Sequence, residues 1–471
     1  MDRQSRAASA LNRFGLGARR GESVQALADP RGWLHAQLDG ASARSLPMPM
    51  TSADYLRAEA DYRRARAQQR RRAAGAEGDD DLALQQARRA LLRTRQAEFV
   101  ARQQRALTTA DGFAERIVRF WSNHFAISVD KRAAALFAAP MEREAIRPHA
   151  FGRFGDLLLA VETHPGMLLY LDNARSVGTD SRLAVRAASS RRDGPPRQLG
   201  LNENLAREIL ELHTLGVDGG YAQADVAELA RAITGWSVAG PRDAGAAAAQ
   251  GYVFRAAAHQ PGPRHVLGKR YAEAGEAQGR AILADLALHP ATARHLAFKL
   301  ARHVVADVPP ARLVERMARA YLSSGGALPA LYRALVDDDA AWTADARKFK
   351  HPDDYLLSAM RTAGIDDAGA IRQALDWQAQ LGQPLFQPRS PAGYADTFAD
   401  WNGADALLKR IQSAQALAEL AGPPPAPPDT LAAAALGPRL DAETAQALRR
   451  AESTRAGLAL LFASPCFQWR V

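Results

Sequence analysis

The polar side chains that are most densely placed for chemistry lie between Leu201 and Trp236. This stretch, LNENLAREILELHTLGVDGGYAQADVAELARAITGW, predicts a helix, a glycine-rich loop and a second helix. It combines carboxylates, amides, an arginine and a histidine, which can bind a divalent cation, share a proton or hold an anionic group. Its spacing matches no catalytic motif, so it indicates a site without naming a reaction.

The first helix of this block is predicted over residues 203–215 and ends at Gly216. At about 100° per residue, Asn204, Glu208 and Glu211 fall on one stripe of its surface. Two carboxylates one turn apart can bind a divalent cation, but the same spacing is also typical of a solvated helix face. Both alternatives stay open from the residues alone.

Two further features supply groups to the predicted site. Arg207 is placed to pair with Glu203, four residues earlier, or to hold an anionic substrate group. The aromatic segment Phe120–Phe125, FWSNHF, contains Asn123 and His124. His124 could be a metal ligand, a general base or a hydrogen-bonded histidine of the core.

We therefore predict one polar site inside a helical domain. The candidate catalytic residues are Glu208, Glu211, His124 and Arg207, and the first three of these are also the candidate ligands of a divalent metal. The candidate binding residues are Asn123, Asn202, Asn204, His213, Asp172 and His259, with the last two in second rank.

Several common chemistries are excluded or disfavoured. The chain has one cysteine, Cys466, so no intramolecular disulfide and no cysteine-rich metal site can form. It contains no GxSxG nucleophile elbow, P-loop, HExxH helix or dinucleotide fingerprint. The segment after Leu381, LGQPLFQPRSPAGYADTFADW, has the composition of an ordered loop and is predicted to form a pocket wall.

The elements that must position these groups are helices. The chain has 471 residues, 47% of them apolar, with much alanine, leucine and arginine and few β-branched residues. We expect a mainly α, multi-helical globular protein with a long helical hairpin insertion and little sheet. The predicted parts are N-terminal helices that pack on the core (1–50), an arginine-rich helical hairpin (51–110), a main helical domain with the candidate site (111–420), and a Pro-rich linker with C-terminal helices (421–471).

The formal net charge is +10. A basic balance permits contact with nucleic acid, but no basic groove interleaved with aromatic residues is present, so we assign most arginines to solvated positions and expect no nucleic-acid partner. No apolar run is long enough to span a bilayer. The sequence as written also has no secretory signal, which predicts a cytoplasmic protein. Export with a partner, or of a longer sequence, stays open.

Several segments together resemble the bacterial DUF1800 family. They are FWSNHFAIS, HPGMLLYLDNARS, the block from Gly200 to Trp236, HPATARHLAFKLARH and LGQPLFQPRSPAGY, and the resemblance covers nearly the whole chain. The chain departs from the family pattern at Ala222, where threonine is frequent, and at Tyr394, where tryptophan is frequent.

The resemblance implies a predominantly helical protein whose function is unknown. It also implies a gene neighbour of the DUF1501 family, which resembles alkaline phosphatases and sulfatases. Two hypotheses follow. The first is an enzyme or enzyme-like protein with a carboxylate and histidine site that could hold a divalent metal. The alternative is a non-catalytic binding or assembly partner of a DUF1501 protein.

Overall fold

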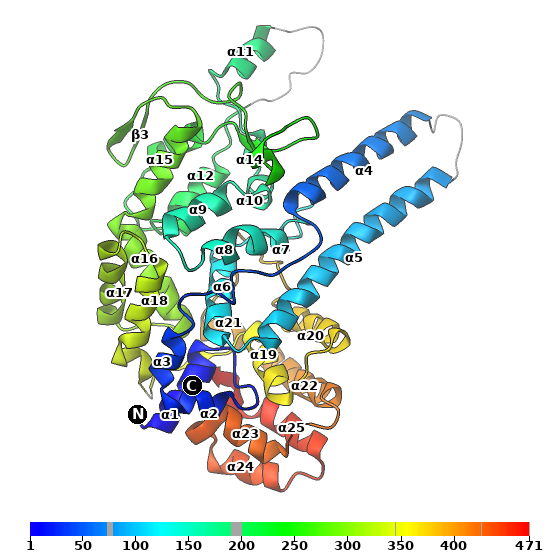
Figure 1. Ribbon diagram of the computed structural model, residues 1–471, viewed down its shortest axis with the longest axis vertical. Coiled ribbons are helices and arrows are strands. Elements are labelled where there is room, and N and C mark those ends of the chain that lie inside the picture. Colours follow the sequence, from blue (N-terminus) through cyan, green and yellow to red (C-terminus); the bar gives the residue numbers. More distant parts are fainter. Residues whose placement is uncertain (73–78, 190–199, 344, 425, 471) are drawn as a thin grey trace.

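The computed structural model describes residues 1–72, 79–189, 200–343, 345–424 and 426–470. Helices dominate these residues and form an elongated body (Figure 1). Strands occur only as three short antiparallel pairs among the described residues. The predicted mainly α class with little sheet is confirmed.

The helices run along the body in chain order. The N-terminal part contains α1 (Arg3–Ser9), α2 (Glu22–Ala28), α3 (Pro30–His35), α4 (Ser52–Arg72), α5 (Asp79–Thr108), α6 (Gly112–His124), α7 (Ala138–Met141), α8 (Arg147–His149), α9 (Phe154–Glu162), α10 (Pro165–Tyr170) and α11 (Arg182–Ser189). The middle contains α12 (Asn204–Glu208), α13 (Gln223–Ala232), α14 (Ala246–Ala249), α15 (Glu276–Ala287), α16 (Pro290–Val304), α17 (Ala311–Ser323) and α18 (Leu328–Asp337). The C-terminal part contains α19 (Pro352–Ala363), α20 (Ala368–Gln380), α21 (Phe398–Trp401), α22 (Ala404–Leu420), α23 (Pro428–Leu436), α24 (Ala442–Arg449) and α25 (Thr454–Ala463).

Wider and tighter helical turns interrupt or extend these helices. The π-helical turns are Ala10–Phe14, Glu142–Ile146 and Ile209–His213. The 3₁₀ turns are Asn173–Arg175, Asp339–Trp342, Gly437–Arg439 and Pro465–Gln468. The strand pairs are β1 (Trp236–Val238) with β2 (Tyr252–Phe254), β3 (Arg264–Val266) with β4 (Lys269–Tyr271), and β5 (Lys348–Phe349) with β6 (Trp469–Arg470).

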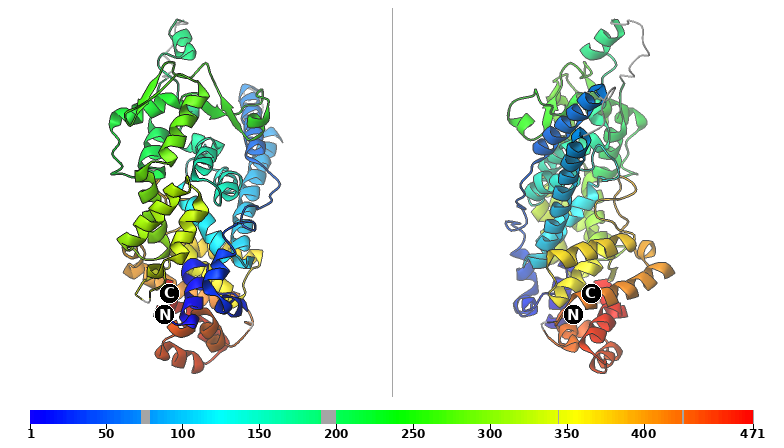
Figure 2. Two further views of the ribbon diagram at one scale, coloured as in Figure 1. Left: turned by 60° about the vertical axis from the view of Figure 1, so that its left-hand side comes forward. Right: turned by 90° about the vertical axis from the view of Figure 1, so that its right-hand side faces the viewer.

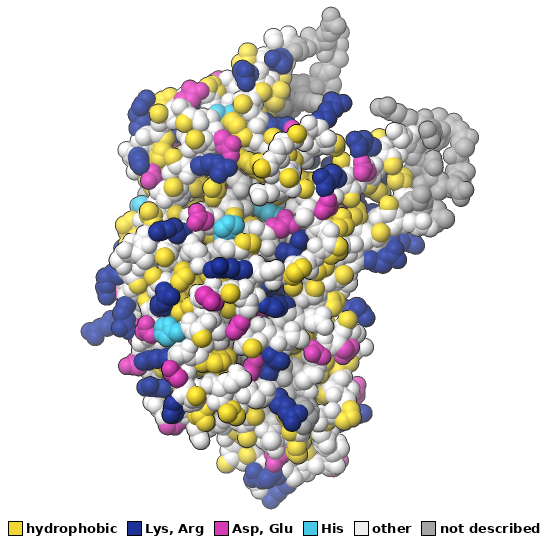
Figure 3. Space-filling model, viewed as in Figure 1, with side chains coloured by type: hydrophobic (Ala, Val, Ile, Leu, Met, Phe, Trp, Pro, Cys, Tyr) yellow, Lys and Arg dark blue, Asp and Glu magenta, His cyan; other side chains and the backbone are white. Residues whose placement is uncertain are grey.

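The predicted hairpin is formed by α4 and α5, which project from the body side by side (Figures 1 and 2). The connection between the two helices, residues 73–78, lies outside the described residues. Arginine gathers on these helices, but Asp54, Glu59 and Asp61 form ion pairs with Arg57, Arg63 and Arg64 along α4. On the face shown in Figure 3, Lys and Arg side chains are spread over the whole surface and mixed with Asp and Glu.

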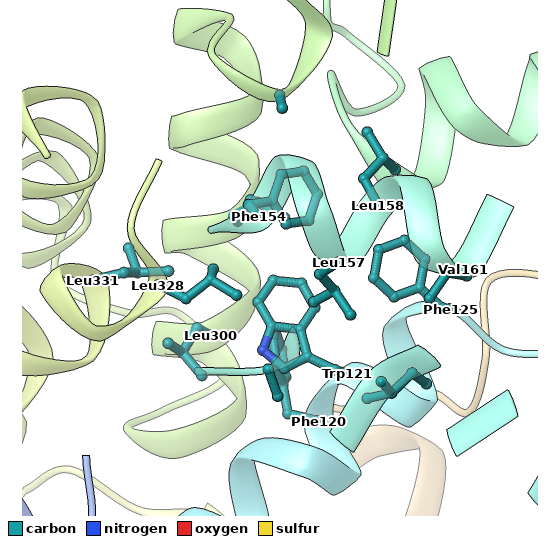
Figure 4. Close-up of a cluster of buried hydrophobic side chains, with 14 of the residues drawn as sticks. Phe120, Trp121, Phe125, Phe154, Leu157, Leu158, Val161, Leu300, Leu328 and Leu331 are labelled. Carbon is teal, nitrogen blue, oxygen red and sulfur yellow. The ribbon is translucent and has the colours of Figure 1, made fainter. Parts of the chain in front are cut away.

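A large apolar cluster surrounds Trp121 in the upper and central body (Figure 4). Trp121, on α6, packs near Phe125, Phe154 and Leu157. Its indole Nε1 donates a hydrogen bond to the Tyr332 hydroxyl at 2.7 Å, so the polar edge of the ring is satisfied inside the core. This arrangement explains why the sequence of α6 is apolar and aromatic.

A second apolar cluster joins the end of α5 to α19, α20, α22, α23 and α25 in the lower body. Helix α6 and the start of α19 lie where the two clusters meet, and both carry buried charged side chains at this junction. None of the helices in the described ranges combines the length and the apolar character that a membrane span requires.

Candidate functional site

A cavity of about 70 Å³ lies where the two apolar clusters meet. Helices α5, α6, α16, α19 and α20 and the loop between α20 and α21 supply its walls. The loop contributes Leu385, Phe386, Pro388, Tyr394 and Asp396, so the sequence-based prediction of a pocket wall after Leu381 is confirmed.

Two histidines and one aspartate gather at this cavity. One ligand atom from each of His303, His351 and Asp396 lies within 4.8 Å of the other two. His303 is near the end of α16, His351 immediately precedes α19, and Asp396 lies in the loop before α21. Two imidazoles and a carboxylate form a ligand set that suits a divalent transition metal.

Two of the three side chains also leave a buried nitrogen without a hydrogen-bond partner. These atoms are Nε2 of His303 and Nδ1 of His351, whereas Asp396 Oδ1 lies 3.2 Å from Lys348 Nζ. The other ring nitrogens are engaged: His303 Nδ1 lies 2.9 Å from Asp396 Oδ2, and His351 Nε2 lies 3.1 Å from Asp354 Oδ2. For His351, the Asp354 carboxylate on Nε2 fixes the tautomer that leaves Nδ1 as a lone pair, as second-sphere carboxylates do for metal-binding histidines. Asp396 is itself a member of the group, so its contact with His303 Nδ1 is not a second-sphere contact.

His351 differs from other histidines at the same position of a helix. His164, His289 and His351 each precede a proline that starts a helix, α10, α16 or α19. In the first two, the ring Nδ1 caps the helix by accepting from Gly166 N at 3.0 Å and Ala291 N at 3.2 Å. His351 makes no such cap, and its Nδ1 is left free beside the cavity.

The ionisation of the three groups suits metal binding. Burial lowers the pKa of His303 to about 4 and also lowers the pKa of His351. Burial by itself raises the pKa of Asp396, but His303 and Lys348 outweigh it and hold that pKa well below its ordinary value. At neutral pH the imidazoles are therefore neutral and the carboxylate is ionised, which are the forms that bind cations.

A buried ionic network surrounds the cavity. It consists of six carboxylates and six cationic side chains, which are Glu115, Glu142, Asp307, Asp353, Asp354, Asp396, Arg102, Arg116, Arg119, Arg147, Arg470 and Lys348. The sequence-based assignment of arginine to solvated positions is wrong for the five arginines of this network, because each is at most 7% exposed. Burial is tolerated because each guanidinium faces a carboxylate.

Strand β6 brings one of these arginines to the two histidines. Arg470 is fully buried, donates from Nη1 to the His303 carbonyl oxygen at 2.7 Å, and places Nη2 2.6 Å from Asp354 Oδ2. Because Asp354 also contacts His351, one guanidinium connects the elements that carry both imidazoles. Lys348, on the paired strand β5, lies 3.2 Å from Asp396 Oδ1.

Of the residues predicted from the sequence, Asn123 lies in the cavity wall. Its Nδ2 donates to the Tyr394 carbonyl oxygen at 2.9 Å, and its Oδ1 accepts from the Tyr394 amide at 2.8 Å. The Asn123 side chain therefore makes the two hydrogen bonds to the Tyr394 backbone that a paired strand would make, and it holds the loop in place. The preceding Gly393 has a φ of 82°, and a Cβ there would lie 2.3 Å from the Asn123 carbonyl oxygen, so the close approach requires glycine.

His124 and His213 lie together in the core, away from solvent. The block departs from the expected continuous α-helix, because α12 ends at Glu208 and a π-helical turn runs over Ile209–His213. His124 Nε2 donates to the His213 carbonyl oxygen at 3.1 Å, and His295 Nε2 donates to the Leu212 carbonyl oxygen at 3.1 Å. These rings satisfy carbonyl groups that the end of a helix leaves free. Burial holds the pKa of His124 well below its ordinary value.

Glu208 and Glu211 remain at the partly exposed face of the block. Burial raises the pKa of Glu208, and the nearby Glu211 carboxylate raises it further. Glu211 accepts from the Tyr221 hydroxyl at 3.2 Å. Within the described part of the chain, the ligand atoms of His124, Glu208 and Glu211 do not gather within 4.8 Å as those of the His303 group do.

The remaining predicted residues have identifiable contacts. Arg207 forms the expected pair with Glu203 at 3.3 Å and also donates to Gln223 at 2.9 Å. Asn202 Oδ1 accepts from the Asn204 amide at 2.9 Å, near the start of α12. The two lower-ranked candidate binding residues also have partners. Asp172 forms an ion pair with Lys131, and His259 Nδ1 donates to the Thr234 carbonyl oxygen at 3.0 Å.

None of His303, His351 and Asp396 was among the site residues predicted from the sequence. The available signal was the segment KHPDD, in which a histidine, a helix-starting proline and two aspartates stand together. Asp396 carries no such signal, because its role depends on a loop that folds back onto α16 and α19.

With the fold and the site described, the comparison with known proteins defines the class of the chain. A family model described as "Protein of unknown function (DUF1800)" matches residues 9–469, so the chain belongs to the DUF1800 family. The resemblance stated from the sequence motifs is confirmed. Neither the curated proteins nor the solved structures contain a match to the chain.

Proposed function

We propose that this DUF1800 protein is a metal-dependent enzyme whose centre is His303, His351 and Asp396. The observation that carries the proposal is the free, buried Nδ1 of His351. His351 immediately precedes α19, and from the same position before their own helices His164 and His289 use Nδ1 as a helix cap, whereas His351 does not. A lone pair inside a protein is costly unless a partner satisfies it.

The ligand set supports a catalytic rather than a structural metal. Three protein ligands leave at least one coordination position for water or substrate, whereas structural zinc sites are closed by four. The group lies at a cavity and not inside solid core. A metal held there would act as a Lewis acid, by polarising a carbonyl or by lowering the pKa of a bound water.

The metal content of the purified protein tests this proposal. Chelator-treated protein is titrated with Zn²⁺, Mn²⁺ and Fe²⁺, the last without oxygen, and binding is measured by calorimetry and elemental analysis. We expect one equivalent of one of these metals. Asp396→Asn and His351→Ala should each weaken binding at least tenfold, because each removes one of three ligands.

Glu208→Gln provides the matched control. It removes a carboxylate that lies in the sequence-predicted polar block and outside the His303 group. We expect metal affinity to stay within twofold of the unsubstituted protein. Loss of metal on Glu208→Gln with retention on Asp396→Asn would instead place the metal at Glu208, Glu211 and His124, and absence of binding by all three metals would refute a metal centre.

The assembly hypothesis predicts a different result. A non-catalytic partner of a co-encoded DUF1501 protein, in the cytoplasm or exported with that protein, should co-purify with it whether or not metal is present. Its support is the family resemblance alone. Co-purification that survives Asp396→Asn, together with absence of bound metal, would favour assembly over catalysis.

A further inference from the structure

We propose that the cavity beside the His303 group binds a small carboxylate anion, with Arg102 as the residue that receives it. This inference rests on the metal centre proposed above and names the class of substrate for it. Two features of the cavity support it: an unused donor and an apolar wall.

The unused donor belongs to Arg102 on α5. This residue lines the cavity and is 5% exposed. Its Nε donates to Glu142 Oε2 at 2.6 Å, but its Nη1 is buried without a hydrogen-bond partner. The neighbouring Arg119 also lines the cavity, and its Nε has no hydrogen-bond partner. A planar guanidinium with a free N–H is suited to a carboxylate.

The apolar wall and the size of the cavity define the rest of the ligand. Ile127, Leu385, Phe386 and Pro388 line the cavity. Phe386 also lies under the Arg102 guanidinium, with 5.0 Å between Cζ and the ring centre. A volume of about 70 Å³ holds on the order of five water molecules. A short aliphatic carboxylate fits this space. A larger anion would exceed the volume of the cavity, and a fully polar anion would leave the apolar wall without contact.

The test measures binding of sodium butyrate to protein loaded with its metal, by calorimetry and by ligand-observed NMR. Inorganic phosphate and butylammonium chloride are titrated in parallel, and metal content is determined in every sample. We expect butyrate to bind more tightly than phosphate and butylammonium not to bind. Arg102→Gln should weaken butyrate at least tenfold, because it removes the charge and the fork of donors.

Two further variants keep the test decisive. Arg93→Gln removes an exposed arginine of the same helix and should leave butyrate binding unchanged. If Arg102→Gln does not fold, Leu385→Asp places a negative charge on a partly exposed residue of the cavity wall and should abolish butyrate binding with metal retained.

The outcomes separate this inference from the proposed function. Absence of metal refutes the metal centre. Bound metal with no butyrate binding, or with butyrate binding that neither Arg102→Gln nor Leu385→Asp changes, overturns the carboxylate assignment alone. Tighter binding of phosphate than of butyrate also overturns it.

Discussion

His213 and Glu162 form a buried acid–base pair at the end of the polar block. Both side chains are fully buried, and His213 Nδ1 lies 2.7 Å from Glu162 Oε1. His213 Nε2 and Glu162 Oε2 have no hydrogen-bond partner. Through this contact the pair joins the end of α9 to the π-helical turn.

This pair gives a prediction about stability. His213→Ala should lower the free energy of unfolding by about 3 kcal/mol, because it leaves the Glu162 carboxylate buried without its partner. Glu203→Gln, which breaks the partly exposed pair with Arg207 in the same block, should cost less than about 1 kcal/mol. Urea unfolding of both variants measures the difference. Equal losses in the two variants would contradict the assignment of a structural role to His213.

The sequence was most informative about contacts between side chains that are a few residues apart in one helix. The Glu203–Arg207 pair follows from helical periodicity, and it is present. Helical periodicity also places His213 away from the stripe of Asn204, Glu208 and Glu211, and His213 is buried. The π-helical turn over Ile209–His213 was not predictable, because no local pattern in the sequence signals the wider turn. The burial of Arg116 and Arg470 could not be read from spacing either, since their partner Asp354 is distant in the chain.

At the scale of elements, the hairpin, α6 and the wall-forming loop were predictable because each has a continuous local pattern. Helices α4 and α5 both lie inside the hairpin range predicted over residues 51–110. The candidate metal centre was not predictable in the same way. Its residues come from α16, the start of α19 and the loop before α21, and only tertiary packing brings these elements together.

Strand β6 permits an experiment on this packing. Arg470→Lys keeps the charge but loses the fork that reaches both the His303 carbonyl oxygen and Asp354. We expect metal affinity to fall about tenfold or more, with a smaller effect on the melting temperature of the metal-free protein. Arg455→Lys, on the exposed surface of α25, should change neither. An unchanged metal affinity in Arg470→Lys would show that β6 does not position the ligands.

For the whole molecule, the buried histidines govern how stability depends on pH. Burial lowers the pKa of His124, His259, His295, His303 and His351, with values of about 4 for His295 and His303. The unfolded chain takes up protons on these groups near pH 6.5, while the folded protein does not. Their contribution is therefore complete above pH 6.5 and is lost as the pH falls toward 4.

The resulting prediction concerns chelator-treated protein between pH 7.5 and pH 5. The urea midpoint should fall with pH, and each neutral buried histidine contributes up to about 1.4 kcal/mol per pH unit. Burial raises the pKa of Glu98 to about 7 and also raises the pKa of Glu208. These two carboxyl groups act in the opposite direction, against five histidines. His295→Gln should reduce the slope relative to the unsubstituted protein. A midpoint that rises toward pH 5, or a slope that His295→Gln leaves unchanged, would contradict this account.

The contact between β6 and β5 has a consequence for biosynthesis. A ribosome that has translated as far as residue 400 has already produced His303, His351 and Asp396, but not the arginine that joins their supporting elements. A nascent chain folds from its N-terminal side as it emerges, so the upper body can form before this last connection exists. Metal loading would then be a late event of maturation, after residue 470 has left the exit tunnel.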